Sequence, residues 1–250
     1  MDTSIQEQFT GLWKRFFGEA DLPVAFFYTD EVKGVDQVPP SFGHRCIFAD
    51  LLRVAKGQSL CFSAESIGCF GGRRYLGFPS EMMPQFEYFL SCGIPGELEG
   101  ERYKKTPELV KEFMKDAPPF EAPGKLIVFK RWDRLQEEDD PEAIIFFACP
   151  DVLSGLFTLA NFDKSDLNGV FAPFSAGCGS VVQYPYLEGQ SDHPRAVLGL
   201  FDVSARPFVP ADVLSFSVPM DRFVTMVGNM EESFLITESW RKIQRRIGQG

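Results

Sequence analysis

The stretch AIIFFACPDVLSGLFTLANF, residues 143–162, decides the fold of this chain. Its first six residues form an unbroken apolar run, which is typical of a buried β-strand. From Asp151 to Phe162 the apolar residues recur at three- and four-residue spacing, which predicts a helix. Strands separated by helices favour crossover connections and at least partly parallel strand pairing. We therefore predict an α/β or α+β fold.

The same order of elements occurs earlier in the chain, which indicates that one unit was copied. Four pairs of segments match in the same order: 23–28 with 143–148, 62–69 with 171–178, 106–120 with 193–208, and 126–135 with 214–223. We predict two related βαβ-containing halves from an internal duplication, packed as one compact unit. The alternative explanation is that both halves use the same strand–turn–helix pattern without a common origin.

The predicted organisation has five segments. They are an N-terminal helix over 1–21, a first half over 22–135, an acidic linker over 136–142, a second half over 143–223 and a C-terminal helical tail over 224–250. The linker QEEDDPE is polar, acidic and contains a proline, which suits the seam between two folded halves.

Composition and charge exclude several classes of protein. The formal net charge is −10, which argues against a nucleic-acid backbone or an anionic membrane as the main partner. No apolar run approaches the ~18–20 residues needed to cross a bilayer. The N-terminus lacks the basic and apolar regions of a signal peptide. We expect a soluble cytoplasmic protein whose six cysteines are reduced.

Two turns share the sequence Ser-x-Gly-Cys, each with a tyrosine six residues after the cysteine. They are SIGCFGGRRYL (66–76) and SAGCGSVVQYP (175–185). Glycine lets a ligand approach the main chain closely, and a helix that starts after the turn favours anions. A thiol at such a helix start tends towards a lowered pKa. We predict that the two turns meet at one cleft and bind a small anionic molecule or cofactor of unknown identity.

The candidate site residues follow from these turns. The candidate catalytic thiols are Cys69 and Cys178. The candidate ligand-binding residues are Gly68, Gly71, Gly72, Arg73, Gly177, Gly179, Ser180 and Arg206. No metal ligands are assigned, because only His44 and His193 are present and no C-x-x-C occurs.

Each of these assignments has a plainer alternative. A Gly-Cys pair after a strand is also a tight bend with a small buried side chain, and Arg206 is also a surface salt-bridge partner. Three functions stay open at this point: a ligand-binding or thiol redox enzyme, a non-catalytic sensor or subunit of a larger complex, and a protein that binds an iron–sulfur or corrinoid-type cofactor. A homo-oligomer is compatible with all three.

Three motifs taken together resemble a known family. They are CFGGRRYLGF (69–78), SAGCGSVVQYP (175–185) and the pair SARPF and LSFSVP between 204 and 219. The chain is similar over about residues 20–230 to a prokaryotic family called domain of unknown function 169, or archaeal conserved region. That resemblance implies a compact, soluble, bacterial or archaeal cytoplasmic protein. The family has no settled activity, so the resemblance implies no catalytic residues.

Overall fold

The computed structural model describes residues 1, 3–41 and 43–247, and these form a mixed α/β fold. The α-helices are α1 (Thr3–Phe17), α2 (Phe48–Ala55), α3 (Phe70–Tyr75), α4 (Phe86–Phe89), α5 (Pro107–Asp116), α6 (Pro150–Leu159), α7 (Tyr184–Gly189), α8 (Met220–Asn229) and α9 (Glu238–Gln244). The strands are β1 (Val24–Thr29), β2 (Asp36–Gln37), β3 (Leu60–Ser63), β4 (Leu126–Arg131), β5 (Ala143–Ala148), β6 (Val170–Phe171), β7 (Ala196–Gly199) and β8 (Leu214–Pro219). The short 3₁₀ helices are η1 (Ala64–Ser66), η2 (Trp132–Arg134), η4 (Arg206–Phe208) and η5 (Phe234–Ile236), and η3 (Gly179–Gln183) is a π-helix.

The eight strands form one sheet in the order β2-β3-β4-β1-β5-β8-β7-β6. The central strands β1 and β5 are antiparallel, with Phe26 opposite Ala143. On either side of this pair the arrangement repeats. The strands β4 and β8 are antiparallel to the centre, β3 and β7 are antiparallel to those, and the short edge strands β2 and β6 are parallel to their neighbours.

Read outward from the centre, both sides of the sheet have the same strand arrangement, as two copies of one unit would produce. The repeated sequence motifs, however, do not all lie in equivalent elements. The strands β1 and β5, and likewise β4 and β8, match both in sequence and in the sheet. The segment 106–120 contains helix α5, however, whereas its predicted counterpart 193–208 contains strand β7. That pairing of segments is wrong, and common ancestry of the halves stays a prediction.

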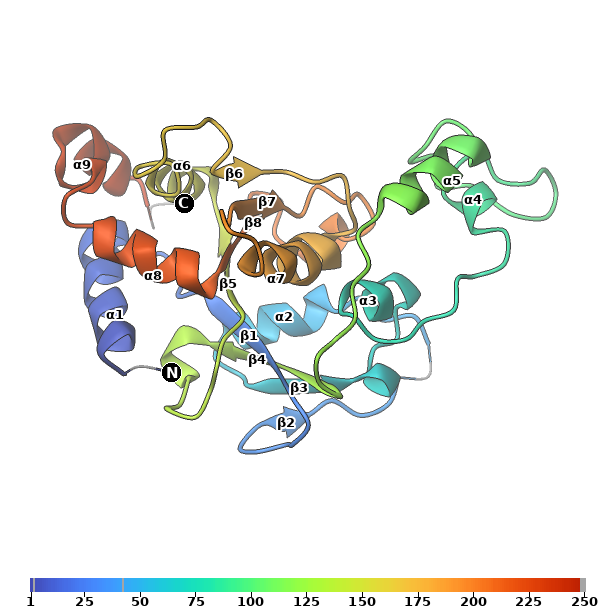
Figure 1. The fold of residues 1–250 in the computed structure, drawn as a ribbon, viewed down its shortest axis with the longest axis horizontal. Coiled ribbons are helices and arrows are strands. Elements are labelled where there is room, and N and C mark those ends of the chain that lie inside the picture. The colour runs from blue at the N-terminus through green and yellow to red at the C-terminus, as the bar shows by residue number, and fades with distance from the viewer. Residues whose placement is uncertain (2, 42, 248–250) are drawn as a thin grey trace. The chain divides into compact units, whose positions relative to one another are not determined.

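Helices cover both faces of the sheet (Figure 1). Strand residues alternate between the faces, so Ile144 and Phe146 of β5 point into a core with α1, α6, α8 and α9. Phe147 points to the opposite face, where its ring meets Phe48 of α2 edge-on at 6.3 Å. On this second face α2 lies against β4 and α7 against β8. The second face carries the candidate site.

Capping residues in the sequence correctly predicted several helix ends. The Thr106 side chain accepts a hydrogen bond from Leu109 N, and Pro107 is the first residue of α5. The Thr237 side chain caps α9 in the same way, and Trp240 of that helix is buried. Gly57 follows α2 with φ of +100°, a conformation that few residues other than glycine adopt.

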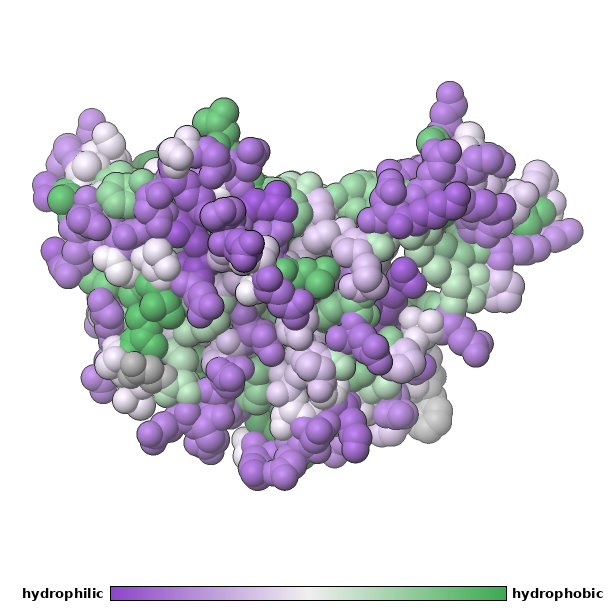
Figure 2. Space-filling view, in the orientation of Figure 1, coloured by the Kyte–Doolittle hydropathy of each residue, from purple (hydrophilic) through white to green (hydrophobic). Residues whose placement is uncertain are grey.

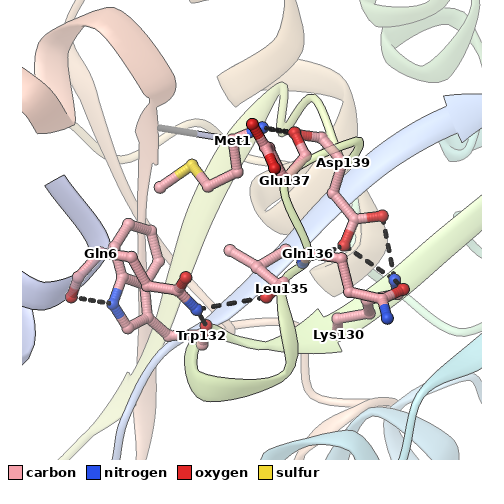
Figure 3. A network of polar contacts seen from close by, with 8 residues as sticks. All are labelled: Met1, Gln6, Lys130, Trp132, Leu135, Gln136, Glu137 and Asp139. Carbon is pink, nitrogen blue, oxygen red and sulfur yellow. Dashed lines mark hydrogen bonds and ion pairs between the residues drawn. The ribbon is translucent and has the colours of Figure 1, made fainter. Parts of the chain in front are cut away.

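The connection between the halves, residues 136–142, is tied to the sheet by a buried ion pair (Figure 3). Lys130 Nζ of β4 contacts Asp139 Oδ2 at 2.7 Å, and both side chains are almost completely buried. The same carboxylate oxygen accepts a hydrogen bond from Gln136 N at 2.8 Å. Although the sequence reads as a solvated acidic linker, one of its carboxylates is therefore part of the interior.

A second partly buried ion pair makes stability depend on pH. Arg222 of α8 donates to both carboxylate oxygens of Asp163, and this lowers the pKa of Asp163 to about 2. A lowered pKa stabilises the fold above the unfolded value of about 4 and loses that effect as pH falls towards 2.

We expect Asp163→Asn to cost about 1 to 2 kcal/mol of unfolding free energy at neutral pH, a figure reduced for the partial exposure of the carboxylate. The difference from wild type should shrink as pH falls from about 4 to about 2. Urea unfolding at a series of pH values measures it. A difference that does not change with pH would show that the pair has no electrostatic role.

Residues 79–121 form a separate compact unit, inserted between α3 and β4. Within it, Glu87 of α4 forms an ion pair with Lys111 of α5 at 3.3 Å. The connection between the two helices, residues 90–106, contains a turn in which Ile94 N donates to Leu98 O at 2.7 Å. The cysteine of this loop, Cys92, is exposed.

Polar and charged residues cover most of the visible face of the molecule, as expected from the net charge of −10 (Figure 2). Among the residues that the structure describes, no helix is both long enough and apolar enough to cross a bilayer.

Candidate functional site

The first Gly-Cys turn leads directly into helix α3. Cys69 is the N-cap of α3, and its sulfur accepts a hydrogen bond from Gly72 N at 3.4 Å. Gly68 packs against the preceding loop: a methyl group placed on it would lie 2.3 Å from Gly43 O. Only a glycine fits there, and this close contact brings the loop that carries Cys46 beside Cys69.

The second turn leads into the π-helix η3, which begins one residue after Cys178. A methyl group on Gly177 would lie 2.6 Å from the ring of Phe48, the first residue of α2. A methyl group on Gly179 would lie 3.1 Å from the ring of Tyr75, the last residue of α3. These two glycines therefore let η3 approach α2 and α3 at once. Single π-helical turns are rare in proteins, and those that occur often lie at functional sites.

The starts of three helices thus bring three thiols together. We call Cys46, Cys69 and Cys178 the thiol cluster; they come from before α2, from the cap of α3 and from before η3. Burial raises the pKa of Cys178 well above its ordinary value, and the neighbouring Cys69 and Cys46 raise it further. The pKa of Cys46 is also raised, by burial and then by Cys69.

These shifts run against one expectation from the sequence. A thiol at a helix start was expected to have a lowered pKa, but the pKa of Cys178 is raised. The physical reason is that removal of the thiolate from water outweighs the effect of the helix dipole when the side chain is buried. Cys69 has a different environment: its side chain is only partly buried, and its sulfur accepts the Gly72 N–H.

Asp202 also lies beside the thiol cluster, and no motif in the sequence pointed to it. It lies in the loop after β7, and its carboxylate accepts hydrogen bonds from Gly177 N at 3.1 Å and from the Ser204 hydroxyl at 2.8 Å. It also raises the pKa of both Cys46 and Cys178. Asp202 therefore holds the second turn in place beside the thiol cluster.

The arginines singled out from the sequence have structural roles. The Arg206 guanidinium donates to three carbonyl oxygens, those of Pro210, Ala211 and Val213, and so closes the loop before β8. Arg73 Nε donates to Ile67 O at 2.9 Å, which holds the first turn against α3.

The remaining candidates act in packing. The Ser180 hydroxyl donates to Gly177 O at 2.8 Å and accepts from Leu200 N at 3.3 Å. Gly72 is buried against Ile67, whereas a methyl group on Gly71 would make only ordinary contacts.

The sheet relates Cys178 to a different cysteine from the one that the repeated motif suggests. Each half has one parallel strand pair with helix between its strands: α2 between β2 and β3, and η3 with α7 between β6 and β7. Cys46 lies just before the helix of the first connection, and Cys178 lies just before the helices of the second. By position in the sheet, Cys46 is the counterpart of Cys178, and Cys69 lies in the loop that corresponds to the one holding Asp202.

Among the residues that the structure describes, no group of three or more His, Cys, Asp or Glu side chains is arranged to hold a metal ion.

A model of the uncharacterised ArCR family matches residues 19–229 of the chain. Comparison with curated proteins and with solved structures found no match.

Proposed function

This chain belongs to the uncharacterised ArCR family, domain of unknown function 169, and from its own geometry we propose that it is a thiol redox protein in which Cys69 is oxidised and Cys178 then forms a disulfide with it. The observation that carries this proposal is the convergence of three thiols from segments far apart in the chain. A merely structural bend would need one small side chain at each turn, and would not require the turns to meet.

The three thiols differ in burial and in their neighbours, as a pair that forms a disulfide after oxidation of one member requires. Cys69 is the strongest electrostatic neighbour, among the cysteines, of both Cys46 and Cys178. It is partly exposed, so an oxidant can reach it, and its sulfur accepts a hydrogen bond from Gly72 N. Cys178 is buried with a raised pKa, so it stays a neutral thiol until an oxidised sulfur forms beside it.

A peroxide supplies the oxidising equivalents in this scheme. The Cys69 thiolate attacks one peroxide oxygen, an S–O bond forms, the O–O bond breaks, and the leaving oxygen takes a proton as water or an alcohol. Cys178 then attacks the sulfenic sulfur, an S–S bond forms, and the sulfenic oxygen leaves as water with the Cys178 proton. A dithiol reductant restores both thiols by exchange.

The test is a titration of the reduced protein with hydrogen peroxide, followed by peptide mapping under non-reducing conditions. We expect one equivalent to remove two thiols and to produce the Cys69–Cys178 disulfide, reversed by dithiothreitol. Cys69→Ser should abolish the disulfide, and Cys178→Ser should leave Cys69 as a sulfenic acid. The control Cys92→Ser, in the separate 79–121 unit, should react as wild type.

Two outcomes would contradict the proposal. Cys92 is exposed and lies outside the thiol cluster, so oxidation of Cys69 no faster than that of Cys92 would remove the special role of Cys69. Formation of a Cys46–Cys69 disulfide alone would keep the redox function and replace the partner. Steady turnover with a dithiol indicates an enzyme, whereas a single stoichiometric oxidation indicates the non-catalytic sensor.

The small anionic ligand, a homo-oligomer and a cytoplasmic location stay predictions. The positive charges of Arg73 and Arg74 in α3 support an anion near Cys69, although Arg73 Nε already donates to Ile67 O and Arg206 to three carbonyl oxygens.

A further inference from the structure

The chain segments around the thiol cluster carry large apolar side chains that are not buried. Phe70, which follows Cys69 directly, is 43% exposed. Phe201 and Val203 lie on either side of Asp202 and are 54% and 68% exposed. We call these three residues the apolar rim. Exposed apolar side chains are ordinary when scattered, but three next to one cluster of reactive groups mark a contact surface.

Backbone contacts place the segments that carry these three residues beside the cluster. The Asp202 carboxylate is bound to Gly177 N, so the loop with Phe201 and Val203 lies beside the second Gly-Cys turn. Ala205, in the same loop, would be 3.3 Å from a methyl group on Gly177. Phe70 reaches the cluster from the first turn, since Cys69 is the residue before it. The rim therefore combines one residue of the first turn with two residues of the loop that is bound to the second turn.

We propose that the oxidant for Cys69 is an organic hydroperoxide with an apolar carbon skeleton, which the apolar rim binds next to the Cys69 sulfur. This inference rests on the proposed thiol redox function and specifies its substrate class. Hydrogen peroxide is small and polar and gains nothing from an apolar surface. An aromatic or alkyl hydroperoxide buries its carbon skeleton against the rim and places its terminal oxygen at the thiol.

The reaction balances without a further reactant. The Cys69 sulfur takes the terminal oxygen, the O–O bond breaks, and the organic alcohol leaves with one proton. The water that leaves in the second step comes from the sulfenic oxygen when Cys178 closes the disulfide, as in the scheme above.

The test compares the rates at which cumene hydroperoxide and hydrogen peroxide oxidise Cys69. Trapping of the remaining thiols at a series of times, with mass spectrometry, measures each rate. We expect cumene hydroperoxide to react about tenfold faster, because part of its ring is removed from water on the rim. In Phe201→Ser the ratio of the two rates should fall to about one. Val203→Ser, at the most exposed rim position, should lower the ratio in the same direction if Phe201→Ser fails to fold.

The matched control is Phe157→Ser. Phe157 of α6 is 49% exposed and belongs to a helix on the opposite face of the sheet, so the rate ratio should stay at the wild-type value. If the wild-type ratio is near one while hydrogen peroxide still forms the disulfide, the substrate class is wrong and the redox function stands. If neither peroxide oxidises Cys69, the redox function itself fails.

Discussion

Asp139→Asn is expected to lower the free energy of unfolding by about 3 to 5 kcal/mol, because it leaves the buried ammonium of Lys130 without its counter-charge. The exposed fractions of the two side chains are 2% for Lys130 and 6% for Asp139, so water cannot replace the lost carboxylate. The carboxylate also holds Gln136 N, so the connection between the two halves should loosen at the same time. Urea unfolding at neutral pH measures the change.

Two further variants separate the charge effect from a general loss of fold. Glu231→Gln breaks an ion pair with Arg15 whose side chains are 58% and 62% exposed, and should cause no measurable loss of stability. The double variant Lys130→Met with Asp139→Leu should recover most of the loss, since an apolar pair of similar size removes both buried charges. If Asp139→Asn is no worse than Glu231→Gln, the buried pair does not stabilise the protein.

Gly199→Ala is expected to destabilise the protein beside the thiol cluster. A methyl group at Gly199 of β7 would lie 2.2 Å from Ser180 Cβ and 2.1 Å from Ser180 Oγ, so η3 must move away from the sheet. Overpacking of this kind costs about 1 to 3 kcal/mol. Because Cys178 precedes η3 directly, we also expect disulfide formation with Cys69 to slow down. Thermal unfolding and the peroxide titration measure the two effects.

The control and the rescue use neighbouring positions. A methyl group on Gly228 of α8 meets nothing within 4 Å, so Gly228→Ala should be neutral or slightly stabilising. Adding Ser180→Gly to Gly199→Ala should restore part of the stability, since it removes the clashing side chain, and a double-mutant cycle gives the coupling. Purely additive effects would show that η3 does not rest on Gly199.

Much of the fold could be predicted from the sequence because helices and strands depend on local patterns. The apolar run 143–148 is β5 and the periodic segment after it contains α6, though this helix begins at Pro150 and ends at Leu159. The caps at Thr106 and Thr237 act within one turn of chain, so the sequence contains the whole interaction. The separate unit 79–121 left no comparable signal, because its boundaries depend on which segments pack together.

The repeated Gly-Cys motif correctly indicated which cysteines lie near one another, but it suggested the wrong pair as structural counterparts. It located Cys69 and Cys178 at the starts of α3 and η3. It did not show that Cys46 and Cys178 lie in equivalent connections, each between the two strands of a parallel pair. The reason is that strand order depends on pairing between segments far apart in the chain. Asp202 was missed for the same reason, as its partner Gly177 lies 25 residues away.

The amino-acid sequence by itself determined the alternation of strands and helices, the helix caps and the acidic surface, since each depends on residues close together in the chain or on composition alone. Only the tertiary structure decided that three helix starts meet, that one carboxylate of the acidic connection is buried, and that the two arginines bind carbonyls. The physical reason is that burial and close approach are set by atoms from distant segments. The Gly177–Phe48 contact, across 129 positions of the chain (177 − 48), exists only once both halves have folded.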